Sequence, residues 1–140
     1  MPYRLDPQVA GELGPDTDLD TSTHPPKVKR LEYVLDQPET DELITSFPVF
    51  LVSDQLGSRL KKAHLDGFKL TKAPVRPSDN YRQLYGKAEH RDYRWLQVTG
   101  APGRSDFWLD QSFNLCVSDG AMAILESAVL SGCTVVRLAD

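Results

Sequence analysis

The sequence predicts an α+β fold, in which a mixed or antiparallel sheet is built from two strand–helix–strand units. The first reason is an internal repeat, because residues 47–71 and 112–136 align without a gap when the chain is shifted by 65 positions. The second is that in both segments an apolar run leads through Ser-Asp into a helical stretch, and a glycine precedes a second apolar run. The third is length, since 140 residues suffice for one domain (1–140) with its own apolar core.

The Ser-Asp pairs at 53–54 and 118–119 mark the expected helix starts. A serine at an N-cap accepts a hydrogen bond from an unpaired helix N–H, and an aspartate beside it complements the positive end of the helix dipole. Gly67 and Gly132 stand where a left-handed residue would end each helix. The duplicated setting therefore favours capping serines over nucleophiles.

The first third of the chain precedes the repeat. Residues 1–27 are rich in proline, glycine, aspartate and threonine, and we expect an extended arm with turns there. Residues 28–35 alternate between apolar and polar side chains, which is typical of a half-buried strand. Residues 40–44 begin with acids and predict a short helical turn.

Between and within the repeats the pattern is less regular. Residues 74–94 have little periodicity, although Tyr81 and two neighbours could share a face of a short helix. A strand is expected at 93–99, and residues 106–109 and 113–117 predict a hairpin that leads into the second unit. The helix after this hairpin is apolar nearly all round, which indicates that it is buried or that one side packs on a partner.

Composition excludes several classes of protein. The chain is 40% hydrophobic and 26% charged, and no apolar run approaches the ~18 residues of a membrane span. The first eight residues lack the basic-then-apolar pattern of a signal peptide, so we expect a cytoplasmic protein without membrane contact. The two cysteines lie in apolar surroundings without metal-ligand spacing, which predicts buried, reduced thiols.

Motifs for catalysis or cofactor binding are missing from the sequence. The three histidines stand apart, and the glycine-containing loop at 100–104 matches no phosphate-binding pattern. The alternating acids Asp16, Asp18 and Asp20 lack the glycine and the final glutamate of a calcium loop. We therefore predict no catalytic residue, no metal and no cofactor.

Charge is unevenly distributed along the chain. Residues 1–50 hold ten acids and four bases, giving −6, whereas residues 51–140 hold ten acids and twelve bases, giving +2. The basic stretch 59–94, with its interleaved tyrosines, leaves open a nucleic-acid-associated module, although a pI near 5.3 is low for one. A small enzyme of unknown chemistry near the two tryptophans is a further alternative.

A set of short segments carries a family resemblance. They are Tyr3-Arg-Leu-Asp, Phe47-Pro-Val-Phe-Leu-Val-Ser-Asp with Gly67-Phe68, Trp95-Leu, Gly103-Arg-Ser-Asp-Phe107 and the closing stretch from Val117-Ser-Asp to Gly132. Together they resemble immunity proteins of bacterial polymorphic toxin systems. The resemblance implies a non-enzymatic, cytosolic protein that neutralises a toxin by direct binding, and it carries over no catalytic residue.

A toxin partner would need a complementary surface. Carboxylates speed the encounter with a basic partner, and aromatic anchors contribute much of the affinity. The predicted carboxylates are Asp16, Asp18, Asp20, Asp36, Glu39, Asp41 and Glu42, and the predicted anchors are Tyr33, Trp95 and Trp108. The basic face of the first repeat helix, with Arg59, Lys61 and Lys62, is the alternative surface.

Overall fold

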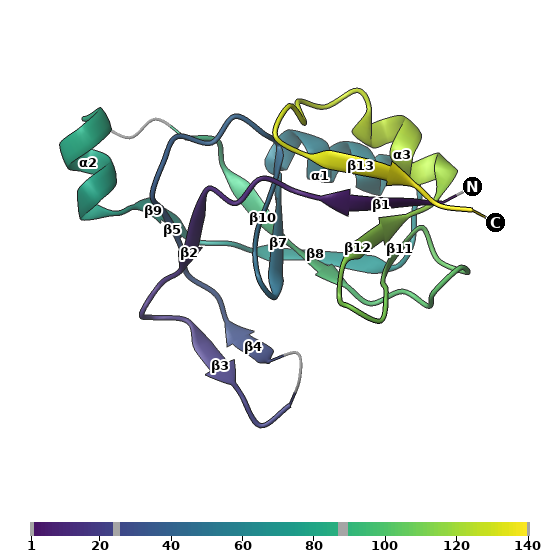
Figure 1. Cartoon of the computed structure of the whole chain (residues 1–140), viewed down its shortest axis with the longest axis horizontal. Coiled ribbons are helices and arrows are strands. Elements are labelled where there is room, and N and C mark those ends of the chain that lie inside the picture. The colour runs from purple at the N-terminus through teal and green to yellow at the C-terminus, as the bar shows by residue number, and fades with distance from the viewer. Residues whose placement is uncertain (1, 24–25, 87–89, 140) are drawn as a thin grey trace.

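The computed structural model describes residues 2–23, 26–86 and 90–139 (Figure 1). Over these residues three helices and thirteen strands form an α+β fold with four sheets, in which the strand pairs are mostly antiparallel. The predicted class is therefore confirmed. Two of the sheets contain the strands of the two predicted units, and these sheets hold most of the core.

The first sheet contains the N-terminal strand and both ends of the second unit. Its order is β11 (Phe107–Leu109), β12 (Leu115–Val117), β1 (Tyr3–Asp6) and β13 (Thr134–Arg137), all antiparallel. The predicted hairpin is the β11–β12 pair. The chain's beginning is extended as expected, but it is no loose arm, because β1 is an inner strand of this sheet.

The second sheet has the same plan. Its order is β6 (Leu43–Ser46), β7 (Val49–Ser53), β10 (Tyr93–Val98) and β8 (Phe68–Lys72), again antiparallel. In both sheets a hairpin precedes the helix, and the strand after the helix is separated from the strand before it by one inserted strand. The inserted strand is β10 in the second sheet and β1 in the first.

The helices of the two predicted units start where the sequence predicts, and a third, short helix lies in the irregular stretch 74–94. They are α1 (Asp54–Lys62), α2 (Asp79–Tyr85) and α3 (Asp119–Leu125), and each has an N-cap serine that accepts a backbone N–H. The glycine expectation is only partly right. The left-handed residue just after α1 is His64, with φ 56°. Gly67 has φ 91° and lies so close to Phe107 that a Cβ would sit 2.2 Å from its carbonyl oxygen.

Two smaller sheets complete the fold. The third contains β2 (Gly11–Leu13), β5 (Tyr33–Leu35) and β9 (Val75–Pro77), and the fourth is the hairpin of β3 (Asp18–Asp20) and β4 (Lys27–Arg30). The single strand predicted at 28–35 is wrong, because β4 and β5 belong to different sheets. All three residues of β5 are buried, because β5 is an inner strand that is covered on both faces. The alternation of buried and exposed side chains that was predicted for 28–35 therefore does not extend into β5.

The core has two parts, one on each face of the second sheet. One cluster lies among this sheet, the first sheet, α1 and α3, and it includes Leu56, Leu96 and Leu115. The other joins the second sheet to the third sheet and includes Tyr33 and Leu51. The helix predicted as buried, α3, contributes its inner side to the first cluster.

The helical turn predicted at 40–44 is also wrong, since these residues lead into β6. The acidic residues Asp41 and Glu42 do not begin a helix; they accept hydrogen bonds from the loop after α3. Glu42 accepts a hydrogen bond from the Ser53 hydroxyl at 2.9 Å and another from the Val129 N–H at 2.8 Å. It thereby joins the N-cap of α1 to the second unit.

Asp106 makes the corresponding contacts from the other unit. It accepts a hydrogen bond from the Ser118 hydroxyl at 2.6 Å and one from the Asp66 N–H at 3.0 Å. Asp66 lies in the connection between α1 and β8. Each carboxylate therefore links the N-cap of its own helix to the loop that follows the other helix.

Candidate functional site

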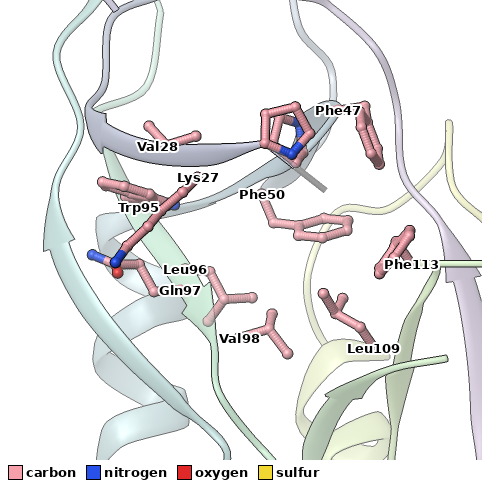
Figure 2. Close-up of a pocket in the computed structure, with 12 residues that line it drawn as sticks. Lys27, Val28, Phe47, Phe50, Trp95, Leu96, Gln97, Val98, Leu109 and Phe113 are labelled. Atoms are coloured by element: carbon pink, nitrogen blue, oxygen red, sulfur yellow. The ribbon is translucent and has the colours of Figure 1, made fainter. Parts of the chain in front are cut away.

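An apolar groove opens where the turns of three hairpins meet the end of β10. Its volume is about 220 Å³, and the β3–β4, β6–β7 and β11–β12 hairpins all contribute residues to its wall. Figure 2 shows Phe50, Val98, Leu109 and Phe113 around a common opening, with Phe47 at the edge. All five of these side chains are hydrocarbon, so this part of the groove favours an apolar occupant.

The mouth of the groove carries an aromatic pair, of which Phe47 is exposed and Phe113 is partly buried. Phe47 is 54% exposed, and its ring centroid lies 6.5 Å from that of Phe113. Aromatic side chains left at the surface beside a hollow are typical of binding sites, because they offer a large apolar area with little conformational freedom to lose. These two residues come from the turn regions of the β6–β7 and β11–β12 hairpins.

The β11–β12 turn holds Phe113 at the mouth in a strained conformation. Its φ is 65°, a left-handed value that costs a bulky residue roughly 1–3 kcal/mol. Asp110 organises the turn, because its carboxylate accepts the backbone N–H groups of Ser112 and Asn114 at 2.9 Å. Burial acts to raise the pKa of Asp110, but these N–H donors outweigh it and keep that pKa below its ordinary value.

The polar rim lies on the side of β10 and the β3–β4 hairpin. Gln97 donates to the Thr71 hydroxyl at 2.8 Å, and Trp95 is half-buried beside it on the same strand. Among the described residues of the lining, Lys27 alone carries a charge. Lys27 lies opposite Asp20 in the β3–β4 register, so a carboxylate of an occupant would share this lysine with Asp20.

The carboxylates predicted on the arm do not form a purely acidic surface. Asp16 and Asp18 are exposed, but in the β3–β4 register Asp18 lies opposite Arg30 and Asp20 opposite Lys27. Cross-strand neighbours of opposite charge attract and partly neutralise each other. The pKa of Asp20 is lowered, mainly by the hydrogen bond from the Ser22 hydroxyl, which keeps it ionised.

The second predicted group of carboxylates follows β5 and comprises Asp36, Glu39, Asp41 and Glu42. Only Asp36 is exposed. The Glu39 side chain is 4% exposed and accepts the Arg91 backbone N–H, and Asp41 is fully buried and accepts the Gly132 N–H at 2.8 Å. Glu39, Asp41 and Glu42 are therefore structural, and the expectation that they face a partner is corrected.

Of the three predicted aromatic anchors, two are buried and one lines the groove. Tyr33 is fully buried, donates its hydroxyl to the Thr45 carbonyl, and has a pKa raised to about 12 by burial. Trp108 is 7% exposed, so these two residues belong to the interior. Trp95 lines the groove.

Sequence reasoning missed Phe47, Phe113 and Lys27 as site residues. A usable signal lay in the repeat itself, because both repeat segments begin within a hairpin turn that carries a phenylalanine. The rest of the groove could not be predicted because its residues are far apart in the sequence; Lys27 and Phe113 are separated by 86 positions. No local pattern predicts that they meet.

The basic stretch 59–94 is spread over several elements of the fold, from α1 to β10. Lys69 and Lys72 lie on opposite faces of β8, as their odd separation in a strand requires. Four arginines of this stretch have partners inside the chain: Arg59 with the Ile124 carbonyl, Arg76 with Glu32, Arg91 with Glu39, and Arg94 with Asp54. The nucleic-acid alternative stays a prediction.

No protein-family model matches the chain, and no curated protein matches its sequence. In the part of the chain that the structure describes, no helix is long and apolar enough to cross a membrane. The same residues include no cluster of three or more His, Cys, Asp or Glu side chains that could hold a metal ion. The resemblance to immunity proteins stays a prediction, and the groove is the feature from which a function can be inferred.

Proposed function

We propose that this protein is a non-enzymatic protein-binding module that uses the apolar groove, and more specifically a cytoplasmic immunity protein that neutralises a toxin by direct binding. The observation that supports the proposal most is the exposed Phe47 beside Phe113 at the mouth of the groove. Binding energy at protein interfaces concentrates in a few aromatic residues at well-packed hollows. The resemblance supplies the toxin as the kind of partner.

The volume of the groove favours a side-chain occupant. At about 220 Å³ it is smaller than the roughly 300–1,000 Å³ of small-molecule sites. We propose that it takes one or two apolar side chains of a partner segment, with an acidic residue next to them that pairs with Lys27. Three hairpin turns form the wall, so an extended segment could lie across the opening.

The test uses a toxin-like domain found in the gene neighbourhood of this protein, purified in an inactive form. Phe47→Asp should weaken binding at least tenfold, equivalent to about 1.4 kcal/mol, and should abolish protection of cells that express the active toxin. Lys27→Glu should weaken binding less and reduce its dependence on salt. Leu84→Asp is the matched control, because Leu84 is 73% exposed on α2, at one end of the molecule (Figure 1).

The possible outcomes test separately whether the protein binds a toxin and whether it does so through the groove. Unchanged binding by Phe47→Asp with an unchanged melting temperature would reject the groove and leave toxin binding intact. Absence of binding by the wild-type chain would reject the immunity role. RNA or DNA that copurifies with the protein and is released by salt would favour the nucleic-acid alternative.

We also infer that the two strand–helix–strand units are an internal repeat. The shared strand plan of the two sheets and the corresponding contacts of Glu42 and Asp106 support this inference. Superposition of residues 47–72 on 112–137 tests it. Unrelated packing angles of α1 and α3 on their sheets would contradict it.

A further inference from the structure

The two larger sheets have four edge strands, and two of these edges are covered by chain. The edge of β6 is occupied by Gln8, whose carbonyl accepts the Thr45 N–H at 2.9 Å. The β11 strand is approached by two glycines, since a Cβ on Gly67 or Gly100 would lie 2.2 or 1.9 Å from the Phe107 carbonyl oxygen. Neither strand is open to an added strand.

The other two edges are β8, with two lysines, and β13, whose one charged residue is Arg137 at its end. The β8 strand carries Lys69 and Lys72, which are the kind of residues that protect an edge from pairing with other chains. The β13 strand, Thr134–Arg137, has neither lysine nor proline, and its register with β1 is regular. All four of its residues are exposed, and Figure 1 shows it on the outer side of β1.

The backbone groups that β13 offers can be assigned from its ladder. The Leu138 N–H donates to the Pro2 carbonyl at 2.8 Å, which makes that pair hydrogen-bonded. Bonded and non-bonded pairs alternate along an antiparallel ladder, so Val136 also bonds to β1. The N–H and C=O groups of Val135 and Arg137 therefore point outward, away from β1.

We propose that β13 pairs antiparallel with β13 of a second copy of this chain, around a two-fold axis at Val136. Val135 then lies opposite Arg137 of the second copy, and the reverse pair follows by symmetry. All outward donors and acceptors of both residues are satisfied by this register. The two Val136 side chains, each 37% exposed in the monomer, meet on one face of the joined sheet.

The size of this contact sets the strength of the dimer. A strand of four residues buries much less than the roughly 800 Å² per partner of a standard stable interface. The dimer is therefore weak and concentration-dependent, and the monomer folds without it. The first sheet contributes to the groove through β11 and the turn after it, and β11 is the edge strand opposite to β13. Dimerisation through β13 therefore leaves the groove open.

Sedimentation velocity of the full chain, from about 10 µM to about 1 mM, tests the proposal. The wild-type chain should shift from monomer to dimer mass over this range. Val135→Pro should stay monomeric, because it removes an outward N–H without removing a bond to β1. Val135→Thr keeps that N–H and should still dimerise, so it is the matched control.

Val136→Lys provides a second test if proline disturbs the fold, as judged by circular dichroism. Two lysines would meet at the two-fold axis, so this variant should also remain monomeric. A wild-type chain that is monomeric at every concentration would overturn the proposal. A dimer that persists in Val136→Lys would overturn it too, because the contact would then lie elsewhere.

Discussion

The contact of Glu42 between the two units allows a quantitative prediction. Its side chain accepts hydrogen bonds from the Ser53 hydroxyl and the Val129 N–H, and the residue is 7% exposed. Hydrogen bonds to a charged acceptor contribute about 1.5–3 kcal/mol each, and a buried donor left without a partner keeps its desolvation cost. Glu42→Ala should therefore lower the free energy of unfolding by about 3–5 kcal/mol.

Two further substitutions separate the hydrogen bonds from the shape of the side chain. Glu42→Gln keeps one carbonyl oxygen for the Val129 N–H, and its amide can donate to Ser53, so about 1 kcal/mol should be lost. Asp106→Ala removes the corresponding contacts at a half-exposed site, where water can replace them, and should cost about 1–2 kcal/mol. Glu126→Gln, at an exposed glutamate, is the control and should stay within about 0.5 kcal/mol.

Urea unfolding followed by tryptophan fluorescence measures these values. With an m-value of about 2 kcal/mol/M, Glu42→Ala should lower the midpoint by about 1.5–2.5 M. If Glu42→Ala and Glu126→Gln unfolded at the same midpoint, the carboxylate would not connect the two units as described. A loss for Glu42→Gln equal to that for Glu42→Ala would show that charge alone decides the stability.

Three groups with shifted pKa values give further predictions. Burial raises the pKa of Tyr33 to about 12, so its protonated hydroxyl stabilises the fold below about pH 10, and this contribution is lost as pH rises through 12. Unfolding free energy measured against pH should therefore fall more steeply above pH 10 for the wild type than for Tyr33→Phe, and parallel curves would contradict this. Burial raises the pKa of Cys133 to about 11, and burial followed by the nearby Asp110 raises that of Cys116. At pH 8 both thiols should react with Ellman's reagent far more slowly in the native protein than in urea, and fast reaction of a native thiol would refute this.

The sequence by itself determined the local features of the fold. The serines at 53 and 118 cap helices because an N-cap depends on its own side chain and the next three residues. The strand at 93–98 and the hairpin before α3 were predictable because alternation and turn residues act over short distances. The α+β class follows from these elements together.

Only the tertiary structure decided which elements share a sheet and which carboxylates are buried. Residues 28–35 separate into two strands because β5 is covered on both faces by segments distant in sequence. Asp41 and Glu42 resemble surface acids in the sequence, but their partners lie about 90 positions away in the loop after α3. The groove depends on three hairpin turns that meet only in the folded chain, because packing, unlike capping, joins residues regardless of their separation along the chain.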